Sequence, residues 1–499
     1  MPVGKVDGRP AGEGDSHTAR MHVLEESDSG IVPMNHSNKD GTPLAEGEEG
    51  RPLVKENTHQ SGTHPTQSGA RVSQGLAGVR KAAKESKEQK FTALLHHLTV
   101  GLLREGFYAL KRKAAPGVDG IRWQEYETGL EDRLIDLHGR VHRGAYRVKP
   151  SRRVYIPKAD GRQRPLGVAA LEDKIVQQAV VTILNQIYEE DFRGFSYGFR
   201  PGRSQHQALD ALTVALKRRR VNCVLDADIR GFFDSIDQEK LMVLVGERIS
   251  DRRVLKLIRQ WLRAGVMEDG TVRETLAGTR QGGVISPLLA NIYLHLLDRL
   301  WAKKCGSLGK LIRYADDFVV MAPTESKAKE ALRQIQFVMS KLGLVLHPEK
   351  TRMVDLRRGK GSFVFLGCAI RKKRSILRNP RAYYMHRWPS PKATKRLRDR
   401  VREITHARNS GQDVKQIIAK LNPVLRGWGN YFRTGTCSRE FLKMDSFVYL
   451  RLVRWFYRRG GQRPTKHAPW THQQLHGMGL HRLRGTVRYP AQAAPGRSS

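Results

Sequence analysis

The sequence is poor in cysteine and has no long apolar run. Cys223, Cys305, Cys368 and Cys437 lie far apart, and none belongs to a C-x-x-C pair. This spacing indicates neither a disulfide framework nor a zinc ribbon, and it fits a reducing compartment. No segment approaches the roughly 18 consecutive apolar residues of a membrane-spanning helix, and the N-terminus lacks the apolar region of a signal peptide. We therefore expect a cytoplasmic protein without membrane contact.

Acidic residues are scarce relative to basic ones. The chain has 89 Lys plus Arg against 49 Asp plus Glu, which gives a net charge of +40. Residues 351–499 hold 34 basic and 6 acidic groups, a net +28, whereas residues 1–100 hold 12 basic and 13 acidic groups, a net −1. So large an excess of positive charge indicates a polyanionic partner, and we expect that partner to be nucleic acid.

The composition changes along the chain. Residues 1–75 are rich in Gly, Ser, Thr, His and Glu with almost no apolar periodicity, so we expect a disordered leader. Residues 76–375 alternate helical and strand-like segments, which predicts an α+β fold. The segment LEDKIVQQAVVTILNQIYEEDF is expected to be a long helix with one core face. The strands are expected at 152–157, 223–229, 311–321 and 363–370.

After residue 390 the sequence becomes helical and basic. Three apolar stripes at helical spacing predict amphipathic helices; they consist of Leu397, Val401 and Ile404, of Val414, Ile417, Ile418 and Leu421, and of Phe441, Met444, Val448, Leu452 and Trp455. We expect these helices to form a separate small domain, residues 376–457. Residues 458–499 are then a basic tail that contacts DNA or RNA.

Two strand-like segments carry candidate catalytic acids. In LIRYADDFVVM, the halves LIRY and FVVM are expected to pair as a hairpin that brings Asp316 and Asp317 to its tip. In CVLDADI, strand alternation sends Asp226 and Asp228 to one face. An isolated Asp-Asp pair would be an ordinary turn. Carboxylates that face one another need a cation, however, and two Mg²⁺ ions about 3.5–4 Å apart can clamp a phosphoryl displacement.

The motifs and their order resemble a known family. YADD, DADIRGFFDSID and TRQGGVISPLLANIYL resemble a reverse transcriptase palm, and the combination resembles the bacterial group II intron-encoded reverse transcriptase/maturase family. Further resemblances lie in RRVYIPKADGRQRPLGVAALEDKIVQQAV, GFSYGFRPGRSQHQAL, LVLHPEKT, FVFLG and LNPVLRGWGNYFR. The resemblance implies an α+β right-hand polymerase with fingers, a ferredoxin-like palm and a helical thumb/maturase (X) domain.

The resemblance also implies an activity and partners. The activity is RNA-dependent DNA polymerisation, in which a primer 3′-hydroxyl activated by one Mg²⁺ attacks the α-phosphate of a dNTP and a second Mg²⁺ stabilises pyrophosphate. The partners are group II intron RNA, whose splicing and mobility the protein would assist, and a DNA target or primer. The protein would then be bacterial and nucleoid-associated when bound to DNA. No paired cysteines of an H-N-H endonuclease follow the maturase region, so second-strand cleavage is not expected.

The resemblance assigns the catalytic acids by position. It implies that Asp228, Asp316 and Asp317 are the catalytic residues and the metal ligands, with Asp228 and Asp316 as the bridging pair and Ile229 as a further ligand. Asp226 lies on the same face as Asp228 and is the alternative if the strand register differs. Otherwise Asp226 is interpreted as a solvated acid at a strand end.

The resemblance likewise assigns contacts to the incoming nucleotide. Lys158 and Arg164 would hold triphosphate oxygens, and Gln281 would lie near the nucleotide in a loop where Arg280 replaces the family's usual proline. Lys350 could protonate the departing pyrophosphate. Each cation could instead be an ordinary solvated loop residue.

A steric gate is expected at Phe233. The resemblance places this ring against the sugar of the nucleotide, where bulk would exclude a 2′-hydroxyl and select dNTPs. The alternative is an ordinary core phenylalanine. Phe232 is expected to turn into the core.

Contacts to the template and to structured RNA complete the implied site. Gly282 and Gly283 would let the backbone approach the template, and Arg200 and Arg203 could touch nucleic-acid backbone. On the helical domain the implied phosphate contacts are Arg396, Arg398, Arg400, Arg426 and Arg433. Trp428 and Tyr431 could stack on bases, but core filling is the favoured interpretation.

Two other functions compete with this interpretation. A domesticated host reverse transcriptase in DNA repair or defence would have the same palm without a flanking intron. An RNA-binding splicing cofactor that no longer polymerises would be expected to carry damaged acids, whereas YADD and DADI are intact. The oligomeric state, the intron and the target site stay open.

Overall fold

A computed structural model describes residues 67–157, 163–218, 221–268, 271–273, 278–279, 282–374, 383–459 and 470–488. Residues 1–66 of the predicted leader, Lys158, Arg280, Gln281 and the part of the tail after residue 488 lie outside them. Helix α1 spans Gln67–Glu85. Helix α1 therefore begins within residues 1–75, the predicted leader.

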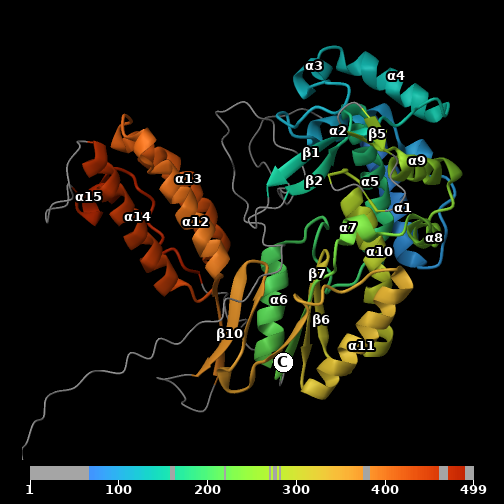
Figure 1. Ribbon diagram of the computed structural model, residues 1–499. Helices are drawn as coiled ribbons and strands as arrows, with labels where there is room; N and C mark the ends of the chain where they lie inside the picture. The colour runs from blue at the N-terminus through green and yellow to red at the C-terminus, as the bar shows by residue number, and fades with distance from the viewer. Residues whose placement is uncertain are drawn as a thin grey trace, which may run out of the picture.

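Helix α5, Leu171–Asp191, is the centre of the N-terminal part. All its predicted core residues are buried: Val176, Val180, Ile183, Leu184 and Ile187. Around α5 lie α1, α2 (Val100–Ala109), α3 (Trp123–Glu127), α4 (Leu130–His142) and the short 3₁₀ helix Leu95–His97 (Figure 1). Because neighbours cover α5 on several sides, Asp173, Lys174 and Gln177 are buried as well. The expectation of a single core face was too narrow.

A small N-terminal sheet lies beside these helices, with strand order β2-β1-β4-β5. Strand β1 (Ser151–Pro157) pairs antiparallel with β2 (Gln163–Val168) and parallel with β4 (Val266–Glu268), which pairs with β5 (Thr271–Arg273). Helices α7 (Phe232–Ser235), α8 (Gln238–Gly246) and α9 (Arg252–Arg263) connect the central sheet to β4.

The central sheet is antiparallel, with strand order β6-β7-β3-β8. The strands are β3 (Cys223–Ala227), β6 (Lys310–Tyr314), β7 (Asp317–Ala322) and β8 (Arg352–Asp355). Side chains alternate between two hydrophobic clusters: Leu225 and Val320 pack with α5, α10 (Ser286–Leu300) and α11 (Glu325–Leu342), whereas Val224 and Val319 pack with α6 (Gln205–Arg218). The π-helical turn Trp301–Cys305 follows α10. The sheet is thus a layer between two cores.

The C-terminal part consists of a small sheet and basic helices. The sheet has the order β11-β10-β9, formed by β9 (Ser362–Phe365), β10 (Cys368–Arg374) and β11 (Tyr383–Pro389), after the short turn Arg357–Gly359. The helices, drawn in orange and red in Figure 1, are α12 (Pro391–Ile404), α13 (Val414–Phe432), α14 (Ser438–Arg459) and α15 (His472–Gly477), with a 3₁₀ turn at Ala407–Asn409. The predicted stripes are buried except Val414, which is half-buried.

The helical part shares one hydrophobic core with the sheets and does not have a core of its own. One cluster runs from α6 and the central sheet through β9 and β10 to α12–α14. The antiparallel pairing of β10 with β11 joins residues on both sides of the boundary predicted at 375/376.

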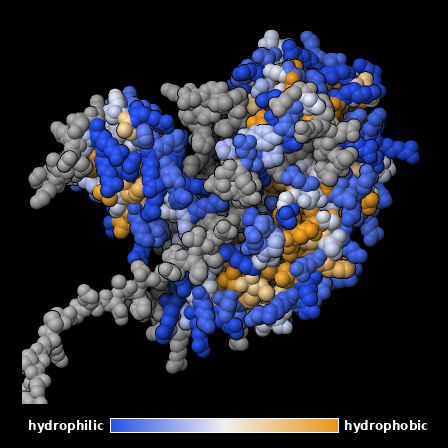
Figure 2. All heavy atoms as spheres, in the orientation of Figure 1, coloured by the Kyte–Doolittle hydropathy of each residue, from blue (hydrophilic) through white to orange (hydrophobic). Residues whose placement is uncertain are grey.

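The visible surface is largely hydrophilic. Figure 2 shows hydrophilic residues over most of the visible face, including α12–α15, and hydrophobic residues near β6 and β7. Among the described residues, no helix combines the length and apolarity needed to cross a bilayer. The mixed α+β class predicted from the sequence is confirmed.

Candidate active site

The YADD segment forms the predicted hairpin. Strands β6 and β7 pair antiparallel with Tyr314 opposite Asp317, so Ala315 and Asp316 make a two-residue turn. Ala315 has φ 58, in the left-handed region that such tight hairpin turns require. Asp316 therefore lies at the bend, while Asp317 is the first residue of β7 and is buried.

A buried arginine holds this turn in place. Arg313, fully buried on β6, donates to both carboxylate oxygens of Asp298, with Nε 2.9 Å from Oδ1. It also donates to Asn291 Oδ1 at 3.0 Å and to the carbonyl oxygen of Ala315 at 2.9 Å. The bond to the Ala315 carbonyl reaches the bend. The Arg313 guanidinium therefore links Ala315, the residue before Asp316, to helix α10.

The loop before α6 packs against the same bend. Asn291 Nδ2 donates to the carbonyl oxygen of Gly198 at 2.8 Å. A Cβ atom at Gly198 would lie 2.2 Å from the backbone nitrogen of Ala315, so only glycine fits there. The next residue, Phe199, has φ 58 and an exposed ring. The segment GFRPG thus packs against the turn formed by Ala315 and Asp316 and supports it.

Asp228 follows β3 and meets a second loop. The backbone N–H of His347 donates to the Asp228 carbonyl at 2.8 Å, and Arg230 N–H donates to Val345 at 2.9 Å. Between them Ile229 bridges to Leu346. This pairing brings Lys350 to the acid, with Nζ 3.4 Å from Asp228 Oδ2. Lys350 therefore lies in the site and is not a solvated loop lysine.

The carboxyl groups of Asp316 and Asp228 influence each other. Burial, together with the nearby charge of Asp228, raises the pKa of Asp316 to about 6, although a backbone hydrogen bond and the charges of Arg164 and Arg313 oppose the shift. The Asp316 side chain keeps partial contact with solvent at the bend. The turn therefore holds an acid that ionises reluctantly unless positive charge comes close.

Asp226 requires a correction. It is buried and not solvated at a strand end, and its Oδ2 lies 3.2 Å from Nε of Arg352, its register partner on β8. Burial raises the pKa of Asp226 to about 6, and the Arg352 charge counteracts this. Its carboxylate is paired across the sheet, so it is a poor substitute for Asp228.

Of the residues predicted to contact the nucleotide, the structure describes only some, and Arg164 is near Asp316. Arg164 lies on β2, close enough for its charge to lower the pKa of Asp316. Phe232 is buried, as predicted, and Phe233 is half-buried with its ring centroid 6.5 Å from that of Phe199. Lys158 and Gln281 lie outside the described residues.

Gly282 and Gly283 follow β5 in sequence and precede α10. Gly282 has φ +107, and a Cβ atom there would lie 2.8 Å from the carbonyl oxygen of Gly167 on β2. The close approach of these two backbones already requires glycine at Gly282. Template contact at Gly282 and Gly283 remains a prediction.

The surroundings of Arg200 are structural, and its predicted contact with nucleic acid remains a prediction. Its guanidinium is buried, with Nη2 2.9 Å from Glu189 Oε2 and Nη1 2.7 Å from the carbonyl oxygens of Arg193 and Ser196. A buried arginine with these partners positions the loop. Arg203 is half-buried, with its guanidinium 5.4 Å from the centroid of the Tyr197 ring.

The arginines of the helical part have varied surroundings. Arg398 lies over the Phe447 ring at 5.5 Å, and Arg400 pairs with Glu403 at 2.6 Å. Arg396 shares α12 with them, Arg426 is exposed on α13 and Arg433 caps the end of α13. Trp428 and Tyr431 are buried, so core filling is confirmed for both.

Comparison with known proteins decides the family. Residues 156–370 match the model of the reverse transcriptase (RNA-dependent DNA polymerase) family, and residues 394–473 match the group II intron, maturase-specific domain. Protein YkfC of Escherichia coli (strain K12) is 35% identical over 296 residues, which are 52% of this chain and 77% of YkfC. The chain belongs to the group II intron reverse transcriptase/maturase family.

Two further relatives carry the intron in their names. Group II intron-encoded protein LtrA of Lactococcus lactis subsp. cremoris is 36% identical over 230 residues, 45% of this chain and 37% of LtrA. An uncharacterized 91 kDa protein in the cob intron of Schizosaccharomyces pombe is 30% identical over 354 residues, 57% of this chain and 43% of that protein. The chain thus spans less than half the length of these two family members. It contains an RNA-dependent DNA polymerase domain and a maturase domain, and the latter implies binding of intron RNA.

Proposed function

We propose that the chain polymerises DNA on an RNA template with two Mg²⁺ ions at Asp228, Asp316 and Asp317, and that it assists splicing and mobility of a group II intron. The observation that carries the proposal is the juxtaposition of Asp316, on a rigid bend, with Asp228 and Lys350. A polymerase family also implies a divalent metal.

The carboxylates of Asp228 and Asp316 fit a Mg²⁺ site that is completed by the phosphates of a bound nucleotide. Among the described residues, no group of three His, Cys, Asp or Glu side chains is close enough to hold an ion alone. Mg²⁺ usually binds to one or two carboxylates together with substrate phosphates and waters, so a complete protein cage is not required. The protein ligands would be the carboxylates of Asp228, Asp316 and Asp317 and the main-chain carbonyl of Ile229. When bound, two ions activate the attacking hydroxyl and neutralise charge on the leaving oxygens.

The chain's own groups orient the reactants. Arg164 provides a fork of donors for triphosphate oxygens beside the acids, and Lys350 can give a proton to the departing pyrophosphate from its position next to Asp228. Arg313 and Gly198 hold the bend, so Asp316 does not have to reorganise during the reaction.

The proposed division follows the right-hand plan. Residues 76–375 would be fingers and palm, with the N-terminal sheet in the fingers and the central sheet in the palm, and residues 376–457 would be the thumb/maturase region. Basic helices α12–α14 would grip the template–primer duplex and intron RNA through Arg396, Arg398, Arg400, Arg426 and Arg433. We further propose a bacterial protein, on the strength of its similarity to YkfC.

The test is extension of a DNA primer on an RNA template with dNTPs and Mg²⁺, with RNA affinity recorded in parallel. We expect template-dependent extension that stops when the ions are chelated and resumes when Mg²⁺ is restored. Tight RNA binding without any extension would overturn the polymerase proposal and favour an RNA-binding splicing cofactor.

Phe233 allows a separate prediction about the sugar. Truncation in Phe233→Ala should raise the use of rNTPs relative to dNTPs by roughly tenfold or more, because the ring that would meet a 2′-hydroxyl is removed. Single-nucleotide incorporation kinetics with both substrates measure the ratio. Phe337→Ala, at an exposed ring on α11, is the matched control and should leave the ratio unchanged. An unchanged ratio in Phe233→Ala would assign this ring to packing.

A further inference from the structure

A buried hydroxyl lies at the base of the maturase-specific helices α12 and α13, where they meet the C-terminal sheet (Figure 1). It belongs to Tyr431, near the end of α13, and it donates to the carbonyl oxygen of Leu366 at 2.9 Å. A phenylalanine ring would fill the same space in the core without needing a partner. The hydroxyl of Tyr431 therefore does something that core filling does not explain.

The acceptor of this hydrogen bond lies in a hairpin turn. Leu366 and Gly367 are the two residues between β9 and β10, because Phe365 is the register partner of Cys368. Their φ angles of 49° and 70° are in the left-handed region that such a turn requires. Leucine adopts this region at a cost, because its Cβ atom crowds the backbone. Hydrogen bonds to the turn therefore stabilise a conformation that its sequence disfavours.

The two carbonyl groups of this turn bind to the two helices. The backbone N–H of Ser390, the N-cap of α12, donates to the carbonyl oxygen of Gly367 at 2.9 Å. The Tyr431 hydroxyl makes the corresponding bond from α13 to Leu366. The start of α12 and the end of α13 are thus fixed to one turn, and the second attachment depends on a single side chain.

Helix α6 connects the same tyrosine to the hairpin that carries the acids. The Nε2 N–H of His206 donates to the carbonyl oxygen of Tyr431 at 2.8 Å, and the two ring centroids are 5.1 Å apart. The preceding residue, Gln205, hydrogen-bonds to the hydroxyl of Tyr314, which pairs with Asp317 in the hairpin. Direct contacts therefore run from α13 through the start of α6 to the YADD segment.

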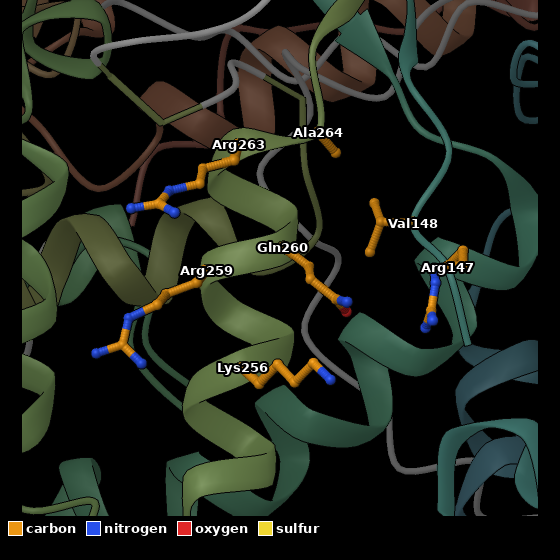
Figure 3. Close-up of a pocket in the computed structure, with 7 residues that line it drawn as sticks. All are labelled: Arg147, Val148, Lys256, Arg259, Gln260, Arg263 and Ala264. Atoms are coloured by element: carbon orange, nitrogen blue, oxygen red, sulfur yellow. The ribbon is translucent and has the colours of Figure 1, made fainter. Parts of the chain in front are cut away.

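The surroundings of this connection are closely packed. A Cβ atom at Gly435, just after α13, would lie 2.4 Å from the carbonyl oxygen of Arg387 on β11. The pocket in Figure 3, of about 420 Å³, lies elsewhere, between α9 and the segment that contains Arg147 and Val148. Closely packed interiors transmit a displacement. A shift at Tyr431 is therefore expected to change how the helices stand on the sheets.

We propose that Tyr431 is a positioning residue for DNA synthesis, whose hydroxyl fixes the angle of α12 and α13 and thereby their grip on the template–primer duplex. Helix α13 has 19 residues. At this length of roughly 28 Å, a rotation of about 5° at the Tyr431 end would move the other end by about 2 Å. Displacements of about 1 Å already weaken positioned contacts. The inference deepens the proposed function and rests on it.

The test is Tyr431→Phe, which removes the hydroxyl and keeps the ring. On a long RNA template, with a trap for released protein, the number of nucleotides added per binding event should fall about fivefold, the factor that loss of one hydrogen bond produces. The rate of the first nucleotide on a pre-bound primer should be unchanged, because Arg313 and Gly198 still hold the acids. Amide hydrogen exchange in β9 and β10 should become faster, because their turn loses an anchor.

Tyr188→Phe is the matched control. Tyr188, on α5, is also buried, and its hydroxyl donates to a backbone carbonyl oxygen, that of Val245, at 3.2 Å. Both variants should lower the melting temperature by similar amounts, because each leaves one buried carbonyl without its donor. The control should keep the product length and the exchange in β9 and β10 of the intact chain.

The outcomes separate this inference from the proposed function. A product length per binding event that is equal for Tyr431→Phe and the intact chain would overturn the inference, as would an equal loss in both variants. In either case the proposed function stands. A first-nucleotide rate that falls as far as the product length would assign the hydroxyl to the acids and overturn its role at the helices. If the intact chain extends no primer, the proposed function fails and the inference fails with it.

Discussion

Asp316→Asn and Asp228→Asn are each expected to reduce dNTP incorporation by about a thousandfold or more, with RNA affinity unchanged. Asparagine keeps the shape of aspartate but removes the charge that would hold a metal and stabilise the transition state, and loss of one such electrostatic group costs two to three orders of magnitude or more. The measurement is single-turnover primer extension at saturating Mg²⁺, together with the dissociation constant for the RNA template–primer.

The Asp316 substitution should not destabilise the fold. Burial raises the pKa of Asp316 to about 6, above that of an unfolded carboxyl, so at neutral pH its ionisation costs folding free energy. Asn removes this cost, and without Mg²⁺ the melting temperature should stay equal or rise. Asp399→Asn, at a half-exposed surface acid on α12, is the control and should retain full extension. If Asp316→Asn and Asp228→Asn both extend primers at the rate of the intact chain, these acids are not the metal site.

Local patterns predicted the parts of the site that depend on local geometry. The apolar run at residues 311–321, interrupted by two acids, predicted the hairpin. A two-residue bend fixes the register of such a hairpin and pairs Tyr314 with Asp317. Strand alternation likewise gave the two faces of β3. The family resemblance then chose Asp228 over Asp226, and the buried pair of Asp226 with Arg352 agrees with that choice.

Contacts between distant segments could not be predicted in this way. Nothing local distinguishes Arg200, which Glu189 and two carbonyls bury, from a solvated loop arginine such as those that contact phosphates. Lys350 meets Asp228 only because the segment at Val345–His347 pairs with the end of β3.

One missed network did leave a signal. Arg313 interrupts an apolar strand, and a charge in a buried strand requires a partner. Asn291 and Asp298 lie seven residues apart, on one face of α10, among residues that are otherwise apolar. Together these features could have suggested a buried ion pair behind the turn that carries Asp316.

Breaking that ion pair should have the largest effect on stability. Arg313→Met and Asp298→Leu, made singly, are each expected to lower the free energy of unfolding by about 3–5 kcal/mol, because each leaves the other charge buried without its partner. Urea denaturation followed by circular dichroism measures the loss. Arg402→Met, at a half-exposed pair with Asp399, should cost less than about 1 kcal/mol.

The double variant Arg313→Met and Asp298→Leu separates stability from positioning. Two apolar side chains of similar volume remove both buried charges, so much of the lost stability should return. The Ala315 carbonyl and Asn291 still lack the donor that Arg313 supplied, so the bend that carries Asp316 loses its anchor. We therefore expect a folded protein whose turnover stays at least about tenfold below that of the intact chain, while its RNA affinity is normal. A double variant with full stability and full turnover would show that Arg313 serves packing alone, and that the hairpin and Gly198 suffice to hold the acids.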